Sequence, residues 1–143
     1  MKLWRLSKFV KLDGEGGRLF AGRWNRGGRA VVYAAESSAL AILEVLVQYQ
    51  RGSIPVPLEF IEIVVPAPLR ILEYGQPTPP SDQGISQDWG EDWLQREASA
   101  LARVPSALAP ESHNLLINPA HPDASQIKVA RHWRHTWDAR LVS

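Results

Sequence analysis

A single carboxylate interrupts one of the most apolar stretches of the chain. Residues 33–50 read YAAESSALAILEVLVQYQ, and Glu44 lies within the apolar run from Leu40 to Tyr49. Side chains three and four positions apart share one face of a helix. At that spacing Glu44 belongs to a narrow stripe made of Ser37, Ala41, Glu44, Gln48 and Arg51. The stripe either faces water or lines a crevice, and a helix with nearly all its other positions apolar is expected to be mostly buried.

A carboxylate with little water around it needs hydrogen-bond or charge partners. Such carboxylates occur in active sites, but also in structural ion pairs. The helical pattern alone therefore leaves a catalytic and a structural interpretation of Glu44 equally open.

The loop GRWNRGGR, residues 22–29, concentrates positive charge. It places Arg23, Arg26 and Arg29 within eight residues, among glycines that allow close approach to the backbone. Guanidinium groups bind phosphate through paired hydrogen bonds. The loop lacks the Gly-Lys-Ser/Thr of a phosphate-binding P-loop and the spacing of a dinucleotide fingerprint. Considered alone, it fits a surface turn with exposed arginines better than a phosphate site.

Other candidate chemistry is weaker. The histidines are His113, His121, His132 and His135. Their spacing is not that of a metal site, so we expect no metal. The sequence has no G-x-S-x-G nucleophile elbow. The tail KVARHWRHTWDAR either binds single-stranded nucleic acid through alternating basic and aromatic residues, or is a strand with Trp133 and Trp137 inward and arginines outward. We favour the strand.

Alternation and helical spacing locate the elements that must position these residues. Strands are expected at 2–7, 30–35, 57–66, 69–74, 104–108, 114–119 and 127–137. Helices are expected from Ser37 or Ser38 to about Arg51, and over residues 88–104, with turns or loops at 13–18 and 75–86. Few strands are joined through helices, so the pattern favours an α+β fold over a parallel doubly wound one.

Bulk properties fit one ordinary globular domain of 143 residues. The chain has no cysteine, no signal-peptide pattern and no apolar run long enough to span a membrane, and we expect a cytoplasmic protein. The formal net charge of +1 hides an asymmetry, because residues 1–30 carry eight basic side chains against Asp13 and Glu15. That excess favours an anionic ligand or an acidic partner, or else forms a solvated basic face.

Several segments together resemble the RES-domain family, the toxins of bacterial RES–Xre toxin–antitoxin pairs. The matching segments, in the family's order, are LWRLS, GRWNRGGRAVVYAAESSALAILEVLV, RVPSALAPESHNLLINPAHPD and the terminal WDARL. They span almost the whole chain, so we expect residues 1–143 to form a single RES domain. The family takes its name from an arginine, a glutamate and a serine.

The resemblance implies an ADP-ribosyltransferase-like α+β fold, with small antiparallel or mixed sheets around a cleft and flanking helices. It implies that NAD is the substrate and that its nicotinamide–ribose bond is cleaved. The ADP-ribose then passes to water or phosphate or, alternatively, to a side chain of a cytoplasmic enzyme. The implied partner is a cognate Xre-type helix-turn-helix antitoxin, which blocks the cleft or holds a closing loop and supplies any link to DNA. A rival of another class is a non-catalytic basic binding module that uses the tail.

The family's functional positions fall on Arg5, Arg23, Tyr33, Glu44 and Ser106. The resemblance implies catalytic roles for Glu44, Arg23 and Ser106. Glu44 would stabilise the charge that develops on the ribose, and the two arginines would hold the pyrophosphate. Tyr33 would stack on nicotinamide, and Ser106 would bond its amide or the ribose. Each residue also has a structural explanation: Tyr33 in the core, Ser106 at a strand end and Arg5 in a surface pair.

Overall fold

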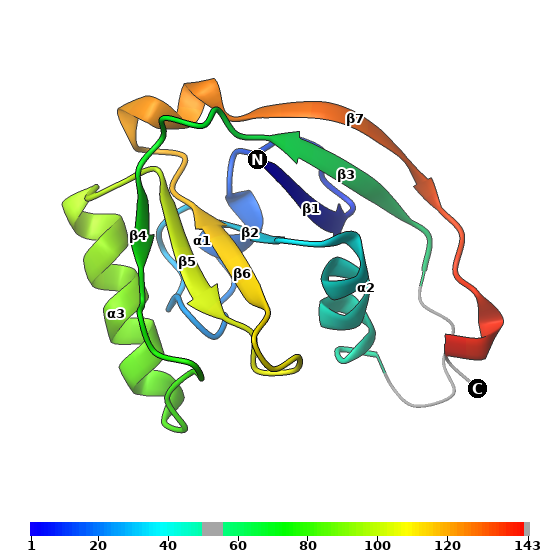
Figure 1. Ribbon diagram of the computed structural model, residues 1–143, viewed down its shortest axis with the longest axis horizontal. Helices are drawn as coiled ribbons and strands as arrows, with labels where there is room; N and C mark the ends of the chain where they lie inside the picture. The colour runs from blue at the N-terminus through cyan, green and yellow to red at the C-terminus, as the bar shows by residue number, and fades with distance from the viewer. Residues whose placement is uncertain (50–55, 142–143) are drawn as a thin grey trace.

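The structure, a computed structural model, describes residues 1–49 and 56–141 (Figure 1). In this part of the chain the strands are β1 (Lys2–Ser7), β2 (Val32–Ala35), β3 (Leu58–Val64), β4 (Ile71–Glu73), β5 (Leu101–Pro105), β6 (His113–Ile117) and β7 (Lys128–His135). The α-helices are α1 (Glu15–Leu19), α2 (Ser38–Leu46) and α3 (Gln83–Arg96), and 3-10 turns cover Pro122–Gln126 and Ala139–Leu141. The expected α+β class is confirmed.

The strands form one mixed sheet in the order β4-β5-β6-β2-β1-β3-β7. Pairing is antiparallel throughout, except between β4 and β5. In the described residues β1 and β2 are in register at one Cα pair, Trp4 and Ala35, whereas β1 pairs with β3 along its whole length. The sheet therefore opens between β1 and β2, and its two halves correspond to the small sheets expected around a cleft (Figure 1).

Alternation along the strands supplies apolar side chains to both faces of the sheet. On β6, Leu115 and Ile117 join the largest buried cluster, which also holds Leu3 and Ile61. Leu116 points the other way, into a cluster that contains Trp93 of α3. Figure 1 shows α3 alongside β4 and β5, and α2 between the two halves of the sheet.

The third helix begins and ends earlier than predicted. The Asp82 side chain accepts a hydrogen bond from the Gly84 backbone N–H at 2.8 Å, which caps the start of α3. Glu97 ends the helix in a left-handed conformation, with φ of 49°. Residues 101–105 then extend as β5 between β4 and β6, so the predicted helix over 88–104 is wrong in its last part. Pairing with neighbouring strands outweighs the helix propensity of ASALARV.

The second helix is shorter and less buried than predicted. It ends at Leu46, because Gln48 and Tyr49 bond back to carbonyls three positions earlier and tighten the chain into turns. Leu40 and Ala41 are its buried residues, whereas Leu43 is 40% and Val47 58% exposed. The predicted position Arg51 lies outside the described residues.

Two smaller expectations also differ from the structure. The expected turn at 13–18 contains the short helix α1. The tail forms β7 as expected, but Trp133 is 39% exposed rather than inward; it stacks on Phe60, and the Arg131 guanidinium lies 4.8 Å from its ring centre. No helix in the described part of the chain is long and apolar enough to cross a membrane.

Candidate functional site

A cavity of about 470 Å³ opens where the two halves of the sheet diverge. Its walls come from β1, β2, α2, α1 and the loop that follows α1. The volume lies within the range typical of small-molecule sites. Residues Arg5, Arg23, Tyr33 and Glu44 all line this cavity, so the structure brings four of the five predicted residues to one place.

Glu44 is half-buried on α2, and hydrogen bonds from two residues of other elements fix one of its carboxylate oxygens. Its Oε1 accepts hydrogen bonds from the Ser106 hydroxyl at 3.0 Å and from the Asn114 side-chain amide at 2.9 Å. No described residue donates a hydrogen bond to Oε2. The helix itself is fixed at its start, where the Ser37 side chain accepts a bond from the Leu40 backbone N–H. One carboxylate oxygen is therefore held and the other is left for a ligand.

Ser106 lies behind Glu44 rather than on the cavity wall. It is 6% exposed, follows β5 directly, and is not among the lining residues. Its oxygen also accepts hydrogen bonds from the backbone N–H groups of Leu108 and Ala109 at 3.0 and 3.2 Å. Because the Ser106 oxygen already accepts hydrogen bonds from these two N–H groups, its own proton is donated to Glu44. The geometry makes Ser106 a residue that positions Glu44, whereas the sequence analysis expected direct contact with the substrate.

Asn114 was missed by the sequence analysis. It lies at the second position of β6, lines the cavity and donates to Glu44. A signal was present, since Asn114 is a polar residue at the start of the otherwise apolar run NLLI. Its partner could not be identified from that run, because Glu44 is 70 positions away in the chain.

The arginines of the basic N-terminal region differ in their surroundings. Arg5 is half-buried on β1 and donates to the Ser7 hydroxyl at 3.0 Å. Burial lowers the pKa of Arg5, and the Asp13 charge opposes that shift. Arg23 is exposed at the cavity, and no described acidic residue forms an ion pair with it. Arg26 instead turns away toward Asp88 of α3, at 2.6 Å.

Tyr33 ties the arginine loop to β2. Its hydroxyl donates to Asn25 Oδ1 at 2.7 Å and accepts from the Trp24 backbone N–H at 2.9 Å. Burial raises the pKa of this hydroxyl well above its usual range, so it remains a donor at any physiological pH. The Asn25 amide in turn donates to the Gly17 and Phe20 carbonyls, at 2.9 and 3.1 Å. The Tyr33 hydroxyl is thus occupied by the loop, while its side chain still lines the cavity.

The cavity has an apolar rim that sequence reasoning did not single out. Phe9 is 62%, Phe20 71% and Val47 58% exposed, and all three line the cavity. Among the described residues no group of three or more histidine, aspartate or glutamate side chains is placed to hold a metal ion.

Together these features define an α+β protein whose cleft combines an anchored carboxylate with arginines, an arrangement suited to a phosphate-bearing small molecule. The RES domain model matches residues 2–138, so the chain belongs to the RES-domain family.

Three relatives extend the comparison. A protein of Sphingobium sp. (strain YBL2), named Prs ADP-ribosylating toxin, is 39% identical over 141 residues, which cover 92% of this chain and 86% of the relative. A Toxin Res of Pseudomonas putida is 37% identical over 136 residues, covering 90% and 92%. A Toxin Res of Yersinia enterocolitica is 38% identical over 113 residues, covering 76% and 74%.

Proposed function

We propose that this protein is a toxin enzyme that cleaves the nicotinamide–ribose bond of NAD and depletes it, as a glycohydrolase or phosphorylase. One observation carries the proposal: a carboxylate anchored by Ser106 and Asn114 lies on the wall of a cavity that also bears Arg5 and Arg23. The names of the relatives support the same class, since each is called a toxin and one an ADP-ribosylating toxin.

The proposed chemistry begins with heterolysis of the bond between the ribose C1′ and the nicotinamide nitrogen. Nicotinamide leaves with the bonding electron pair, and positive charge develops on the ribose ring. The free Oε2 of Glu44 stabilises that charge or accepts a hydrogen bond from a ribose hydroxyl. A nucleophile then bonds to C1′, and its proton passes to solvent or to the carboxylate. Arg23 and Arg5 hold the pyrophosphate.

A protein ADP-ribosyltransferase is the second candidate. The exposed apolar rim of Phe9, Phe20 and Val47 supports it, because water or phosphate needs no such surface and a protein acceptor does. The name of the Sphingobium relative supports it too. In either case we expect the protein to act in the cytoplasm and to be neutralised by an Xre-type helix-turn-helix antitoxin, which provides its link to DNA.

The reaction is tested with purified protein and NAD. Nicotinamide release is measured with and without phosphate, and label transfer from NAD is followed in a cytoplasmic extract. Free ADP-ribose identifies a glycohydrolase, ADP-ribose 1″-phosphate a phosphorylase, and labelled protein a transferase. NAD that stays intact in every arm, in the absence of an antitoxin, overturns the proposal.

Replacing Glu44 tests the catalytic carboxylate. In Glu44→Gln the amide oxygen still accepts from Ser106 and Asn114, so we expect an unchanged circular dichroism spectrum. The charge is lost, and nicotinamide release should fall by about 100-fold or more. Glu36→Gln is the matched control, because Glu36 accepts a hydrogen bond from the His113 backbone N–H at 2.8 Å but does not line the cavity. Full activity in Glu44→Gln would contradict the assignment.

A further inference from the structure

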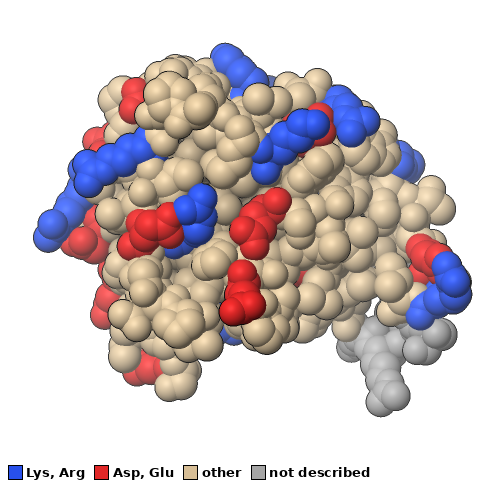
Figure 2. Space-filling view, in the orientation of Figure 1, with Lys and Arg blue, Asp and Glu red and all other residues tan. Residues whose placement is uncertain are grey.

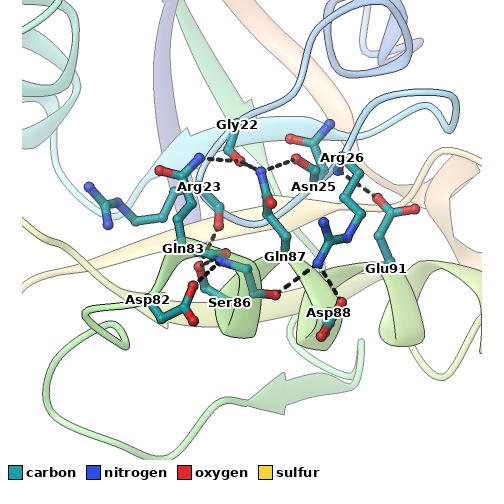
Figure 3. Close-up of polar contacts among 11 residues, drawn as sticks. Gly22, Arg23, Asn25, Arg26, Asp82, Gln83, Ser86, Gln87, Asp88 and Glu91 are labelled. Carbon is teal, nitrogen blue, oxygen red and sulfur yellow. Dashed lines mark hydrogen bonds and ion pairs between the residues drawn. The ribbon is translucent and has the colours of Figure 1, made fainter.

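Helix α3 holds the loop that carries Arg23 through several polar side chains (Figure 3). The Ser86 hydroxyl donates a hydrogen bond to the Arg23 carbonyl at 2.6 Å, and Ser86 is fully buried. The Gln83 carbonyl of α3 lies 3.0 Å from the same hydroxyl, so the shorter contact, to the Arg23 carbonyl, takes its single proton. A buried hydrogen bond of this kind fixes the Arg23 peptide more firmly than a surface contact would. The backbone of Arg23 is thus held although its side chain is exposed.

The carbonyls on either side of Arg23 are also held by α3. The Gln87 side-chain amide donates to the Gly22 carbonyl at 3.0 Å and to the Asn25 carbonyl at 3.3 Å. Gln83 donates to the Gly22 carbonyl as well, at 3.3 Å. Figure 3 shows these side chains reaching from successive turns of α3 to the same loop.

A glycine allows α3 to come this close. A Cβ added at Gly90 would lie 1.7 Å from the Trp24 carbonyl oxygen, which no side chain can occupy. Glycine is unfavourable in the interior of a helix. Its presence in the middle of α3 is explained by the contact with the loop.

Arg26 belongs to the same contact. Its guanidinium bonds Asp88 and the Gly84 carbonyl, at 2.6 and 3.0 Å, and its backbone N–H donates to Glu91 at 3.0 Å. The two neighbouring arginines therefore have different tasks: Arg26 fastens the loop to α3, and Arg23 extends into the cavity.

We propose that Ser86, Gln87 and Gly90 are positioning residues that hold Arg23 ready for the pyrophosphate of NAD. The inference rests on the proposed function. With the backbone on both sides of Arg23 fixed in advance, binding has to immobilise only the arginine side chain, and less conformational freedom is lost. These three residues act through Arg23 on the pyrophosphate, which is the part of NAD that does not react. Their removal should therefore raise the KM for NAD more than it lowers kcat.

The test compares two buried serines. Ser86→Ala removes the bond to the loop, whereas Ser99→Ala removes hydrogen bonds to Trp93 and the Leu101 carbonyl, neither of which belongs to the loop. Both should lower stability. We expect the KM for NAD to rise about three- to tenfold in Ser86→Ala alone, with kcat within about twofold. Gln87→Leu should act like Ser86→Ala, and Gln95→Leu, an exposed glutamine of the same helix, is its control.

Two further measurements separate positioning from general damage. Backbone amides of residues 22–26 should exchange hydrogen faster in Ser86→Ala than in Ser99→Ala. In an Arg23→Ala background, Ser86→Ala should raise KM no further, because the residue on which it acts is gone. The positioning role is overturned if KM is unchanged in Ser86→Ala and Gln87→Leu, or if the effects of Ser86→Ala and Arg23→Ala on KM are additive. Either result leaves the proposed function standing. A wild-type protein that does not turn over NAD overturns the proposed function, and with it the positioning role of Ser86, Gln87 and Gly90.

Discussion

At the scale of single residues, the site depends on how one carboxylate is oriented. Leu43 and Val47, which are near Glu44 in the sequence, are exposed, so apolar packing around it does not by itself orient the carboxylate. Ser106 and Asn114 hold the carboxylate instead, from other elements of the fold. A hydrogen bond to a charged group is stronger than one between neutral groups, so each donor contributes substantially to the position of Oε1.

Removing either donor should impair catalysis more than binding. In Asn114→Ala and Ser106→Ala we expect kcat for nicotinamide release to fall by about ten- to 100-fold, the loss equivalent to a hydrogen bond to an ionised group. The KM for NAD should change less, because neither bond reaches the pyrophosphate. Ser112→Ala is the control, as no described hydrogen bond involves its side chain. Normal kcat in both variants would show that Glu44 needs no anchoring.

At the scale of elements, ion pairs join the strands of one half of the sheet. Glu62 on β3 is 5% exposed and bonds Arg131 of β7 at 3.0 Å and Lys2 of β1 at 3.3 Å. The hydrogen bond from Arg131 lowers the pKa of Glu62, and Lys2 adds to the shift. This buried carboxylate thus links three neighbouring strands that also share apolar contacts.

The lowered pKa makes stability depend on pH in acid. Because the carboxyl pKa is lower in the folded protein than in the unfolded chain, the contribution of Glu62 is complete above the ordinary value of 4.5 and is lost as pH falls through the folded value. Urea unfolding at pH 7, 5, 4 and 3 should show this loss in the wild-type protein and a flatter dependence in Glu62→Gln. Identical pH profiles would show that the pairs with Arg131 and Lys2 do not matter.

Elements also explain where local patterns misled. The run ASALARV has helical propensity, yet its second half belongs to β5. Hydrogen bonding to β4 on one side and β6 on the other stabilises the extended conformation. On α2 the apolar pattern is real, but only Leu40 and Ala41 are buried, and part of the helix lines the cavity.

At the scale of the whole molecule, basic and acidic side chains are mixed on the face that Figure 2 shows. Its Lys and Arg side chains are spread over the left, upper and right parts of this face, with Asp and Glu among them. Several arginines are ion-paired, including Arg26 with Asp88 and Arg131 with Glu62. This arrangement argues against a continuous basic track for nucleic acid.

We therefore expect no appreciable binding of single-stranded DNA at physiological salt. Fluorescence anisotropy of a labelled oligonucleotide, titrated with the protein between 50 and 200 mM salt, measures it; these concentrations are about those at which phosphate contacts weaken most visibly. Tight binding that weakens steeply with salt would favour the non-catalytic basic module instead. Arg134→Ala in β7 would then be the next variant to test, since its side chain is exposed.

The sequence by itself determined the periodic elements, the position of Glu44 on a helix and the family segments, because periodicity and motifs are properties of neighbouring residues. Only the tertiary structure decided that Ser106 and Asn114, 62 and 70 positions from Glu44, share its carboxylate. The same holds for Ser86, 63 positions from the Arg23 carbonyl that it fixes. Such contacts depend on strand order, register and the closeness of α3 to a loop, and none of these is carried by a local pattern.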